Sequence, residues 1–184
     1  MESKLKRIDR KLAYKGEVVD LYKDTMEYPD GSCHEWDFVH HKRPNGALIL
    51  PVLPDGRILT ISQYRPASDS IMLELPAGSK EPFDRDTCET AGRELVEETG
   101  HVSGDIRFLM RIYLAVAYDD EWLDIYVAYN CHKDESGQLL DSGEDIKTDI
   151  YTLSDLLSKI KNGELMDGPA VAAITAYAAG LIEE

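Results

Sequence analysis

The chain has 184 residues, of which 43% are hydrophobic and 30% charged, a composition typical of one globular domain and not of a disordered or fibrous protein. Its formal net charge of -15, with no stretch that gathers the basic residues, argues against a nucleic-acid partner. Three cysteines without a C-x-x-C pair, no signal-peptide core and no apolar run near the roughly 20 residues of a membrane span predict a soluble, cytoplasmic protein.

The N-terminal part of the chain is predicted to form strands separated by turns. Residues 17–21 favour a short strand, Pro29-Asp30-Gly31 a turn, and residues 36–41 a further extended segment. We interpret His40 and His41 as ordinary strand residues, because neither has a partner at metal-ligand spacing. A small antiparallel sheet is therefore expected near the N-terminus.

Further strands are predicted through the middle of the chain. Residues 47–53 and 57–63 are apolar runs joined by Pro54-Asp55-Gly56, and a turn of this kind between two such runs predicts a hairpin. The remaining runs with a strand-like pattern are residues 71–75, 107–114 and 123–129.

Helical patterns lie between and after these strands. Residues 86–99 predict a helix, with Asp86 placed as in a capping box and Gly100 as a typical end. Residues 152–160 are amphipathic, and Pro169 stands where a first helical turn tolerates it, opening a helix through residue 179. Strands followed by scattered helices indicate an α/β or α+β sandwich.

The most informative stretch is Arg93-Glu94-Leu95-Val96-Glu97-Glu98-Thr99-Gly100. On a helix, Glu94, Glu97 and Glu98 share one face, about 5–6 Å apart at Cβ. Charges this close are relieved by proton uptake, basic partners or a cation, and hard carboxylate oxygens suit Mg²⁺ or Mn²⁺. For an isolated E-x-x-E-E pattern a solvated face is the alternative. The chemistry that the cluster favours is metal-assisted attack of water on phosphorus.

This stretch resembles the second half of the Nudix box, G-x5-E-x7-R-E-U-x-E-E-x-G-U, in which U is a bulky apolar residue. The resemblance implies that Glu94, Glu97 and Glu98 bind divalent metal, with Glu97 and Glu98 also serving catalysis. It further implies that Arg93 fixes the helix by pairing with the first acid of the box, and that Gly78 and Gly100 are the glycines of the motif.

Two positions depart from the pattern. Gly78 to Arg93 is one residue longer than in the motif, so the first acid falls on Asp84, with Glu89 as a second candidate for the partner of Arg93. His101 occupies the last apolar position. We interpret the first departure as a one-residue insertion in the loop, which leaves the metal ligands unchanged.

Two further segments narrow the resemblance. Gln63-Tyr64-Arg65 and residues 73–78, LELPAG, are similar to the signature of ADP-ribose pyrophosphatases and related sugar-nucleotide hydrolases, as are residues 163–168. This likeness implies that Arg65 contacts the pyrophosphate, that Glu74 assists in binding substrate or metal, and that the Ala77 carbonyl binds metal. A planar guanidinium suits phosphate oxygens, in agreement with the role implied for Arg65.

The residue that activates water is less sharply indicated. Related enzymes use a glutamate of an acidic loop, which makes Glu121 the candidate, with Asp119, Asp120 and Glu144 as competitors. The proline-glycine pair that ADP-ribose hydrolases commonly carry before this loop is absent. Another nucleoside diphosphate sugar or a linked dinucleotide is therefore an alternative substrate.

Aromatic residues and the N-terminal segment complete the interpretation. Trp36, Tyr28 and Trp122 are candidates to stack on a nucleobase, although packing is the commoner role of such residues. Related enzymes are usually homodimers in which the N-terminal sheet completes the partner's site, and residues 17–41 correspond to that sheet.

The resemblance implies a single Nudix domain over residues 1–184, with a β subregion at about 1–43 contributing to dimerisation and a catalytic core at about 44–184. The expected fold is an α/β/α sandwich with a mixed sheet plus an N-terminal antiparallel sheet. The expected activity is Mg²⁺-dependent hydrolysis of the pyrophosphate bond of ADP-ribose or a related sugar nucleotide. The alternatives are hydrolysis of GDP-mannose or a dinucleoside polyphosphate, and a non-catalytic ADP-ribose sensor, and the intact glutamate set favours catalysis.

Overall fold

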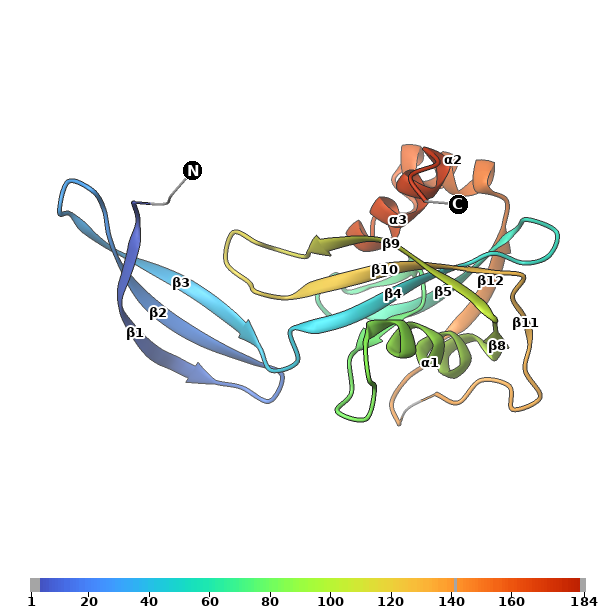
Figure 1. Ribbon diagram of the computed structural model, residues 1–184, viewed down its shortest axis with the longest axis horizontal. Helices are drawn as coiled ribbons and strands as arrows, with labels where there is room; N and C mark the ends of the chain where they lie inside the picture. Colours follow the sequence, from blue (N-terminus) through green and yellow to red (C-terminus); the bar gives the residue numbers. More distant parts are fainter. Residues whose placement is uncertain (1–3, 141, 183–184) are drawn as a thin grey trace. The chain divides into compact units, whose positions relative to one another are not determined.

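The computed structural model, drawn in Figure 1, describes residues 4–140 and 142–182. By its internal contacts the chain divides into two units, each of which is described by itself. Unit 1 comprises Met1–Pro44 and Tyr113–Trp122, and unit 2 comprises Asn45–Ile112 and Leu123–Glu184. Among the described residues, no helix is both long and apolar enough to cross a membrane.

Unit 1 contains the predicted antiparallel sheet, in the order β1-β2-β3. The strands are β1 (Lys6–Lys15), β2 (Val19–Glu27) and β3 (Cys33–His41). β2 and β3 pair without interruption around the turn at Gly31, whose φ of 84° favours glycine. The strand predicted at residues 17–21 begins later and extends further. β1 was not predicted, because its charged sequence KRIDRKLAYK shows no apolar run and becomes a strand by pairing with β2.

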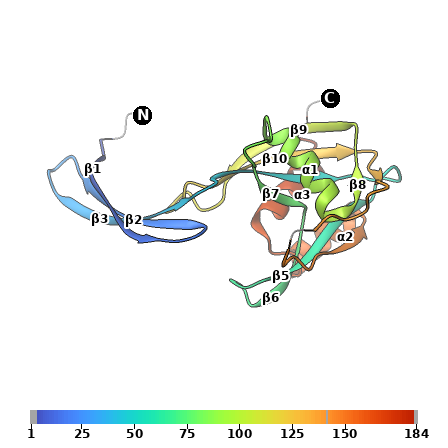
Figure 2. The same cartoon turned by 90° about the horizontal axis from the view of Figure 1, so that it is seen from below.

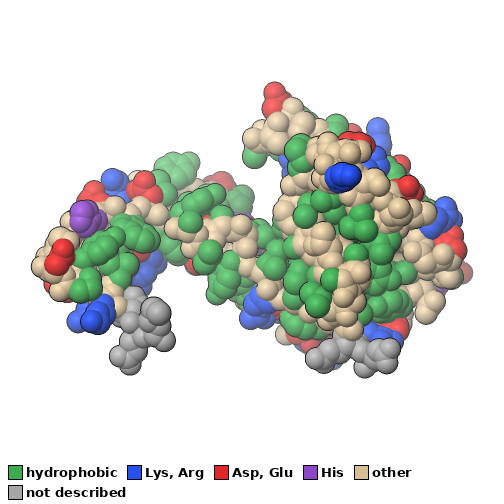
Figure 3. Space-filling model, turned by 90° about the horizontal axis from the view of Figure 1, so that it is seen from above, with side chains coloured by type: hydrophobic (Ala, Val, Ile, Leu, Met, Phe, Trp, Pro, Cys, Tyr) green, Lys and Arg blue, Asp and Glu red, His purple; other side chains and the backbone are tan. Residues whose placement is uncertain are grey.

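The described residues of unit 1 form no apolar core. None of its described apolar side chains is buried, and its one buried charged residue is Asp24, at 5% exposure. Arg10 donates to both oxygens of Asp24 at 2.6 Å, from Nε and from Nη2. Apolar side chains instead lie at the surface of the unit (Figure 3), namely Ile8, Leu12, Tyr14, Val18, Val19, Trp36, Tyr113, Leu114, Val116 and Tyr118.

Unit 2 is built from sheets and helices. One sheet has the order β7-β4-β10-β9 and another the order β12-β5-β6, and β11 and β8 form a two-stranded ladder. The first sheet consists of β4 (Asn45–Pro51), β7 (Ala77–Ser79), β9 (Asp105–Tyr113) and β10 (Trp122–Tyr129). The other strands are β5 (Ile58–Arg65), β6 (Ser70–Glu74), β8 (His101–Val102), β11 (His132–Lys133) and β12 (Lys147–Tyr151), and the helices are α1 (Thr87–Thr99), α2 (Leu153–Asn162) and α3 (Gly168–Ala178).

Successive residues of β4 face opposite helices. Leu48 and Leu50 belong to an apolar cluster that includes α2 and α3, whereas Ala47 and Ile49 belong to a second cluster with α1. Figure 1 shows α1 on one side of the β4–β10 sheet and α2 and α3 on the other, and Figure 2 shows α1 in front of that sheet. The predicted α/β/α sandwich is confirmed.

The hairpin predicted across Pro54-Asp55-Gly56 is wrong. The turn itself forms, with Gly56 at φ 81° and the Leu53 N–H donating to the Arg57 carbonyl at 2.8 Å. After a single bridge between Val52 and Ile58, β4 and β5 separate into different sheets. Each strand has two other neighbours, and the residues of both that lie near the turn are buried on both faces, so their apolar runs carried no information on pairing.

The ends of α1 match the sequence signals. The Asp86 side chain accepts from the Glu89 N–H at 3.0 Å, and Gly100 caps the C-terminus with φ 65°. The Glu89 carboxylate does not return to Asp86 but accepts from the backbone N–H of Arg85 at 2.7 Å. These caps fix the register of the helix that carries the glutamate cluster.

Candidate active site

Helix α1 places two carboxylates against the backbone that precedes it. Glu94 and Glu98, one turn apart, are 8% and 4% exposed. The Ala77 N–H donates to Oε2 of Glu98 at 3.0 Å. A Cβ atom on Gly78 would lie 2.0 Å from Oε1 of Glu94. Glycine at position 78 therefore leaves room for the Glu94 carboxylate to lie against the backbone of β7.

Both carboxylates are removed from water, and the positive charge near them does not offset that loss. Burial raises the pKa of Glu98 to about 8, and the negative charge of Glu94 adds to the effect. Burial likewise raises the pKa of Glu94 to about 7, against the opposing influence of Arg93. The charge of Glu144, in the loop before β12, raises both pKa values further, so this residue lies near the pair. A site of this kind gains stability when a proton or a cation enters it.

Arg93 connects the helix to the loop before it. Its Nη2 donates to Oδ2 of Asp84 and to the Ser79 carbonyl, both at 3.1 Å. Its Nη1 donates to Glu94 at 2.8 Å and to Glu97 at 2.7 Å. The arginine therefore holds one acid of the loop and two acids of the helix at once.

Asp84 anchors the loop before α1. It is 6% exposed and accepts from Thr90 Oγ1 and from the Glu81 N–H, each at 3.0 Å, in addition to Arg93. Burial alone would raise the pKa of Asp84, but these donors together lower it below its usual range. Glu89, the other candidate partner of Arg93, forms an ion pair with Arg85 instead.

The three glutamates do not form a closed metal site as they stand. Over residues 4–140 and 142–182, no group of three His, Cys, Asp or Glu side chains is arranged to hold an ion. Glu97, with its side chain 35% exposed, is bound to Arg93. Glu94 and Glu98 nevertheless fit a divalent cation, since they are hard oxygen donors, buried, close together and underneutralised.

Arg65 and Glu74 form a second polar group, at the ends of β5 and β6. Arg65 donates from Nε to Oε1 of Glu74 at 2.8 Å and from Nη2 to Oε2 at 2.6 Å, and Gln63 donates to Oε2 at 3.2 Å. Glu74 is buried, whereas 48% of the Arg65 side chain is exposed. The charge of Glu98 raises the pKa of Arg65, after the larger effect of the Glu74 bond, so the guanidinium lies near the carboxylate pair.

Asp167 is a further member of this group, one that was not predicted from the sequence. Its carboxylate caps α3 by accepting from the Ala170 N–H at 2.9 Å. Burial raises the pKa of Asp167, and the negative charge of Glu74 raises it further, while Arg65 lowers it. An aspartate before Gly-Pro signals a helix start and nothing more, so its sequence context gave no reason to place it beside Arg65.

The remaining candidate residues lie in unit 1 and are described within that unit. Glu121 is half-buried, which raises its pKa against the opposing charge of His41. Asp119 accepts from the Glu121 N–H at 3.0 Å. Trp36 on β3 is 44% exposed, and the Tyr28 ring meets that of His34 edge-on, with 5.1 Å between centroids.

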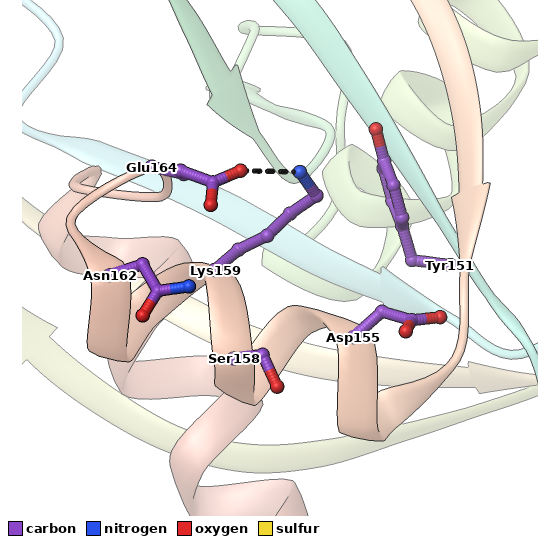
Figure 4. Close-up of a pocket in the computed structure, with 6 residues that line it drawn as sticks. All are labelled: Tyr151, Asp155, Ser158, Lys159, Asn162 and Glu164. Atoms are coloured by element: carbon purple, nitrogen blue, oxygen red, sulfur yellow. Dashed lines mark hydrogen bonds and ion pairs between the residues drawn. The ribbon is translucent and has the colours of Figure 1, made fainter.

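A hollow of about 370 Å³ lies beside α2 (Figure 4). In it Lys159 and Glu164 point toward each other and form an ion pair at 2.8 Å, and the Lys159 ammonium lies 5.1 Å from the centre of the Tyr151 ring. None of the predicted site residues lines the hollow, which is formed by Tyr151, Asp155, Ser158, Lys159, Asn162 and Glu164.

Comparison with known proteins gives concordant matches. A family model described as the NUDIX domain matches residues 42–173. The chain is 30% identical, over 92% of its length and 90% of the relative, to an ADP-ribose pyrophosphatase of Bacillus subtilis (strain 168) and, with the same coverage, to a methanol dehydrogenase activator of Bacillus methanolicus. A solved structure of an ADP compounds hydrolase has a TM-score of 0.85 at 20% identity, covering 97% of this chain and 95% of that one, and so has the same fold.

Proposed function

Because the chain belongs to the Nudix family and is a Nudix hydrolase acting on nucleoside diphosphate derivatives, we propose that its substrate is ADP-ribose or a related sugar nucleotide. Water adds across the pyrophosphate bond, and the products are a nucleoside monophosphate and a sugar phosphate. The observation that carries the proposal is the buried pair Glu94 and Glu98, set against Ala77 and Gly78 on a helix that Arg93 ties to its loop.

Nudix hydrolases generally need a divalent metal, and we propose Mg²⁺, with Mn²⁺ as a substitute. Glu94, Glu97, Glu98 and the Ala77 carbonyl would hold it, and once bound it supplies charge that polarises phosphoryl oxygens and lowers the pKa of water. Glu97 first has to exchange its bond with Arg93 for this role. Arg93 keeps its bonds to Asp84 when Glu97 turns, so the helix stays fixed.

The other residues bind and orient the substrate in this proposal. Arg65 presents its exposed edge to the diphosphate, while Glu74 holds the opposite edge of the guanidinium in a fixed plane. Glu121 deprotonates the attacking water, a role for which a carboxyl group of raised pKa is suited. Trp36 and Tyr28 contact the nucleoside.

We further propose that the chain works as a cytoplasmic homodimer, in which residues 1–43 meet a second copy. A three-stranded sheet that buries none of its described apolar side chains is not independently stable unless another surface covers it. Light scattering coupled to size exclusion tests this: twice the chain mass supports the dimer, and a monomer at micromolar concentration contradicts it.

The activity is tested with a panel of nucleotide sugars. ADP-ribose, GDP-mannose and a dinucleoside polyphosphate are incubated with Mg²⁺ or EDTA, and a phosphatase converts the products to free phosphate. Release of phosphate from ADP-ribose in the samples with Mg²⁺, and not in those with EDTA, supports the proposal. Because the loop before Glu121 lacks the usual proline, GDP-mannose is the second candidate substrate, and a faster rate with it would reassign the specificity.

Two variants separate catalysis from binding alone. Glu98→Gln removes a ligand inside the site, and Glu89→Gln, on the same helix, alters a carboxylate that pairs with Arg85 outside it. The proposal requires loss of turnover in the first and not in the second. If the wild type binds ADP-ribose but releases no AMP under any metal condition, the chain is a sensor and not a hydrolase of this substrate.

A further inference from the structure

The loop between β9 and β10 is attached to the end of β3. This acidic loop, residues 115–121, belongs with the N-terminal strands in unit 1. The Val39 N–H donates to the Tyr118 carbonyl at 2.7 Å, and Val39 and Asp119 form a parallel bridge. The backbone pairing of β3 therefore continues into the loop.

His40 and Asp120 add side-chain bonds at the same place. Nδ1 of His40 donates to Oδ2 of Asp120 at 2.6 Å, across 80 residues of sequence. The His41 N–H donates to the other oxygen, Oδ1, at 3.2 Å. Both oxygens of Asp120 are thus bound by consecutive residues of β3, and a carboxylate held at both oxygens has a fixed orientation.

Glu121 follows Asp120 directly and is held by its own backbone. Its N–H donates to Oδ1 of Asp119 at 3.0 Å, and its carbonyl accepts from the Leu114 N–H at 3.0 Å. The Glu121 backbone is therefore held on both sides, and the side chain of the preceding residue, Asp120, is joined to β3 by the His40 ring and the His41 N–H.

We propose that His40 is a positioning residue, which through Asp120 fixes the acidic loop and with it the Glu121 side chain. The inference rests on the proposed function, in which Glu121 activates water. A general base has to lie within hydrogen-bond reach of its proton, and a displacement of about 1 Å lowers the rate on the order of 100-fold. The N-terminal sheet would then carry part of the catalytic machinery in addition to any role in assembly.

Kinetic measurements on two His40 variants test the role. His40→Ala removes the donor, and His40→Asn places an amide N–H near the position of Nδ1. We expect the alanine variant to lower kcat about 10- to 100-fold with KM changed less than about two-fold, and the asparagine variant to recover most of the loss. The matched control is His132→Ala, which removes a histidine of β11 that is bonded to the Asn130 carbonyl. This variant should leave kcat unchanged.

Amide hydrogen exchange provides a readout that does not require activity. In His40→Ala, the amides of Val39, Leu114 and Glu121 should exchange faster, while the β2–β3 ladder keeps its protection. Asp120→Ala removes the bonds from both His40 and the His41 N–H, so its effect should be at least as large, and the double variant should be no worse than Asp120→Ala alone.

Three results would overturn the proposal. They are unchanged exchange in the loop of His40→Ala, a kcat within two-fold of the wild type, or a loss that appears in KM alone and so indicates substrate contact. A wild type that hydrolyses no nucleotide sugar would refute the proposed function, and the exchange measurement would still decide whether His40 holds the loop.

Discussion

Asp24 of unit 1 and the pair Glu94 and Glu98 of unit 2 are buried in opposite electrostatic surroundings. In unit 1, Asp24 is 5% exposed, and the paired bonds from Arg10 lower its pKa. In unit 2, Glu94 and Glu98 are buried to a similar degree, but desolvation dominates and raises their pKa values to about 7 and about 8. A buried carboxylate that an arginine neutralises stabilises the fold, whereas one left without enough positive charge is prepared for a cation.

The apolar packing next to these carboxylates also differs between the two regions. Behind Glu94 and Glu98 lie the fully buried Ala91 and Leu95, so the packing of α1 on the sheet keeps the carboxylates out of water. Unit 1 has no comparable support, and Asp24 depends on its ion pair and on backbone ladders. Burial of Glu94 and Glu98 is thus offset only in part by positive charge and depends on apolar packing. Burial of Asp24 is offset by an opposite charge, as it also is for Glu74 and Asp84 of unit 2.

The largest effect is expected at Glu98. Glu98→Gln should lower kcat at saturating Mg²⁺ by at least about 100-fold, the upper end of the effect of outer-shell partners of a metal. The same change should not lower the melting temperature without metal, because an amide relieves the buried charge. Steady-state kinetics and calorimetry check the two parts, and a variant that keeps its turnover would remove Glu98 from the site.

Breaking the ion pair between Arg10 and Asp24 in unit 1 should lower stability, unlike the change at Glu98. Asp24→Asn weakens the two bonds with Arg10 and is expected to destabilise the sheet by about 1.5–3 kcal/mol, as for hydrogen bonds to charged groups. Hydrogen exchange of the β1 and β2 amides measures the loss. Equal protection in variant and wild type would show that Asp24 does not support the sheet.

The contact between Gly78 and Glu94 gives a sterically defined test. Gly78→Ala should cost about 1–3 kcal/mol of stability, as overpacking does, and displace the carboxylate, because the added Cβ would lie 2.0 Å from Oε1. Gly104→Ala, where a Cβ meets nothing within 4 Å, is the matched control. Thermal unfolding and kcat should change in the first variant alone, and equal behaviour of the two would contradict the contact.

Dependence on pH should give the smallest effect, with one sign for Glu94 and Glu98 and the opposite sign for Asp24. The pKa values of Glu94 and Glu98 are raised from 4.5, so their contribution to stability is present below pH 4.5 and lost as pH rises through about 7 and 8. The pKa of Asp24 is lowered from 3.8, so its contribution is present above pH 3.8 and lost as pH falls further.

Unfolding in EDTA between pH 6 and pH 9 measures the first of these effects. The wild type should lose at least about 2–4 °C in Tm, the equivalent of 1 kcal/mol, and Glu98→Gln should lose less. The same decline in both proteins would show that the buried carboxylate does not titrate in this range.

Local signals in the sequence predicted helix α1 and its ends well. The Asp86 cap, the Gly100 end and the glutamate spacing are all properties of consecutive residues, and they appear in the structure as predicted. The sandwich also followed from its pattern of strands and helices, and the position of Asp84 in the loop identified the acid that Arg93 contacts.

Features that depend on distant residues were not predictable in this way. β1 and β12 become strands through pairing with β2 and β5, and β4 leaves the hairpin because β10 lies beside it. The same is true of Asp167 beside Arg65 and of His40 bound to Asp120, since neither pair is adjacent in sequence. Such partners are fixed by tertiary packing, which leaves no mark on the local pattern.

The most direct test of the metal site is a crystal grown with Mn²⁺ and a non-hydrolysable analogue of ADP-ribose, with anomalous data collected at the manganese edge. We predict a manganese ion bound by Glu94, Glu97, Glu98 and the Ala77 carbonyl, with Glu97 released from Arg93. A nucleotide bound in the crystal with no ion next to these oxygens would contradict the assignment.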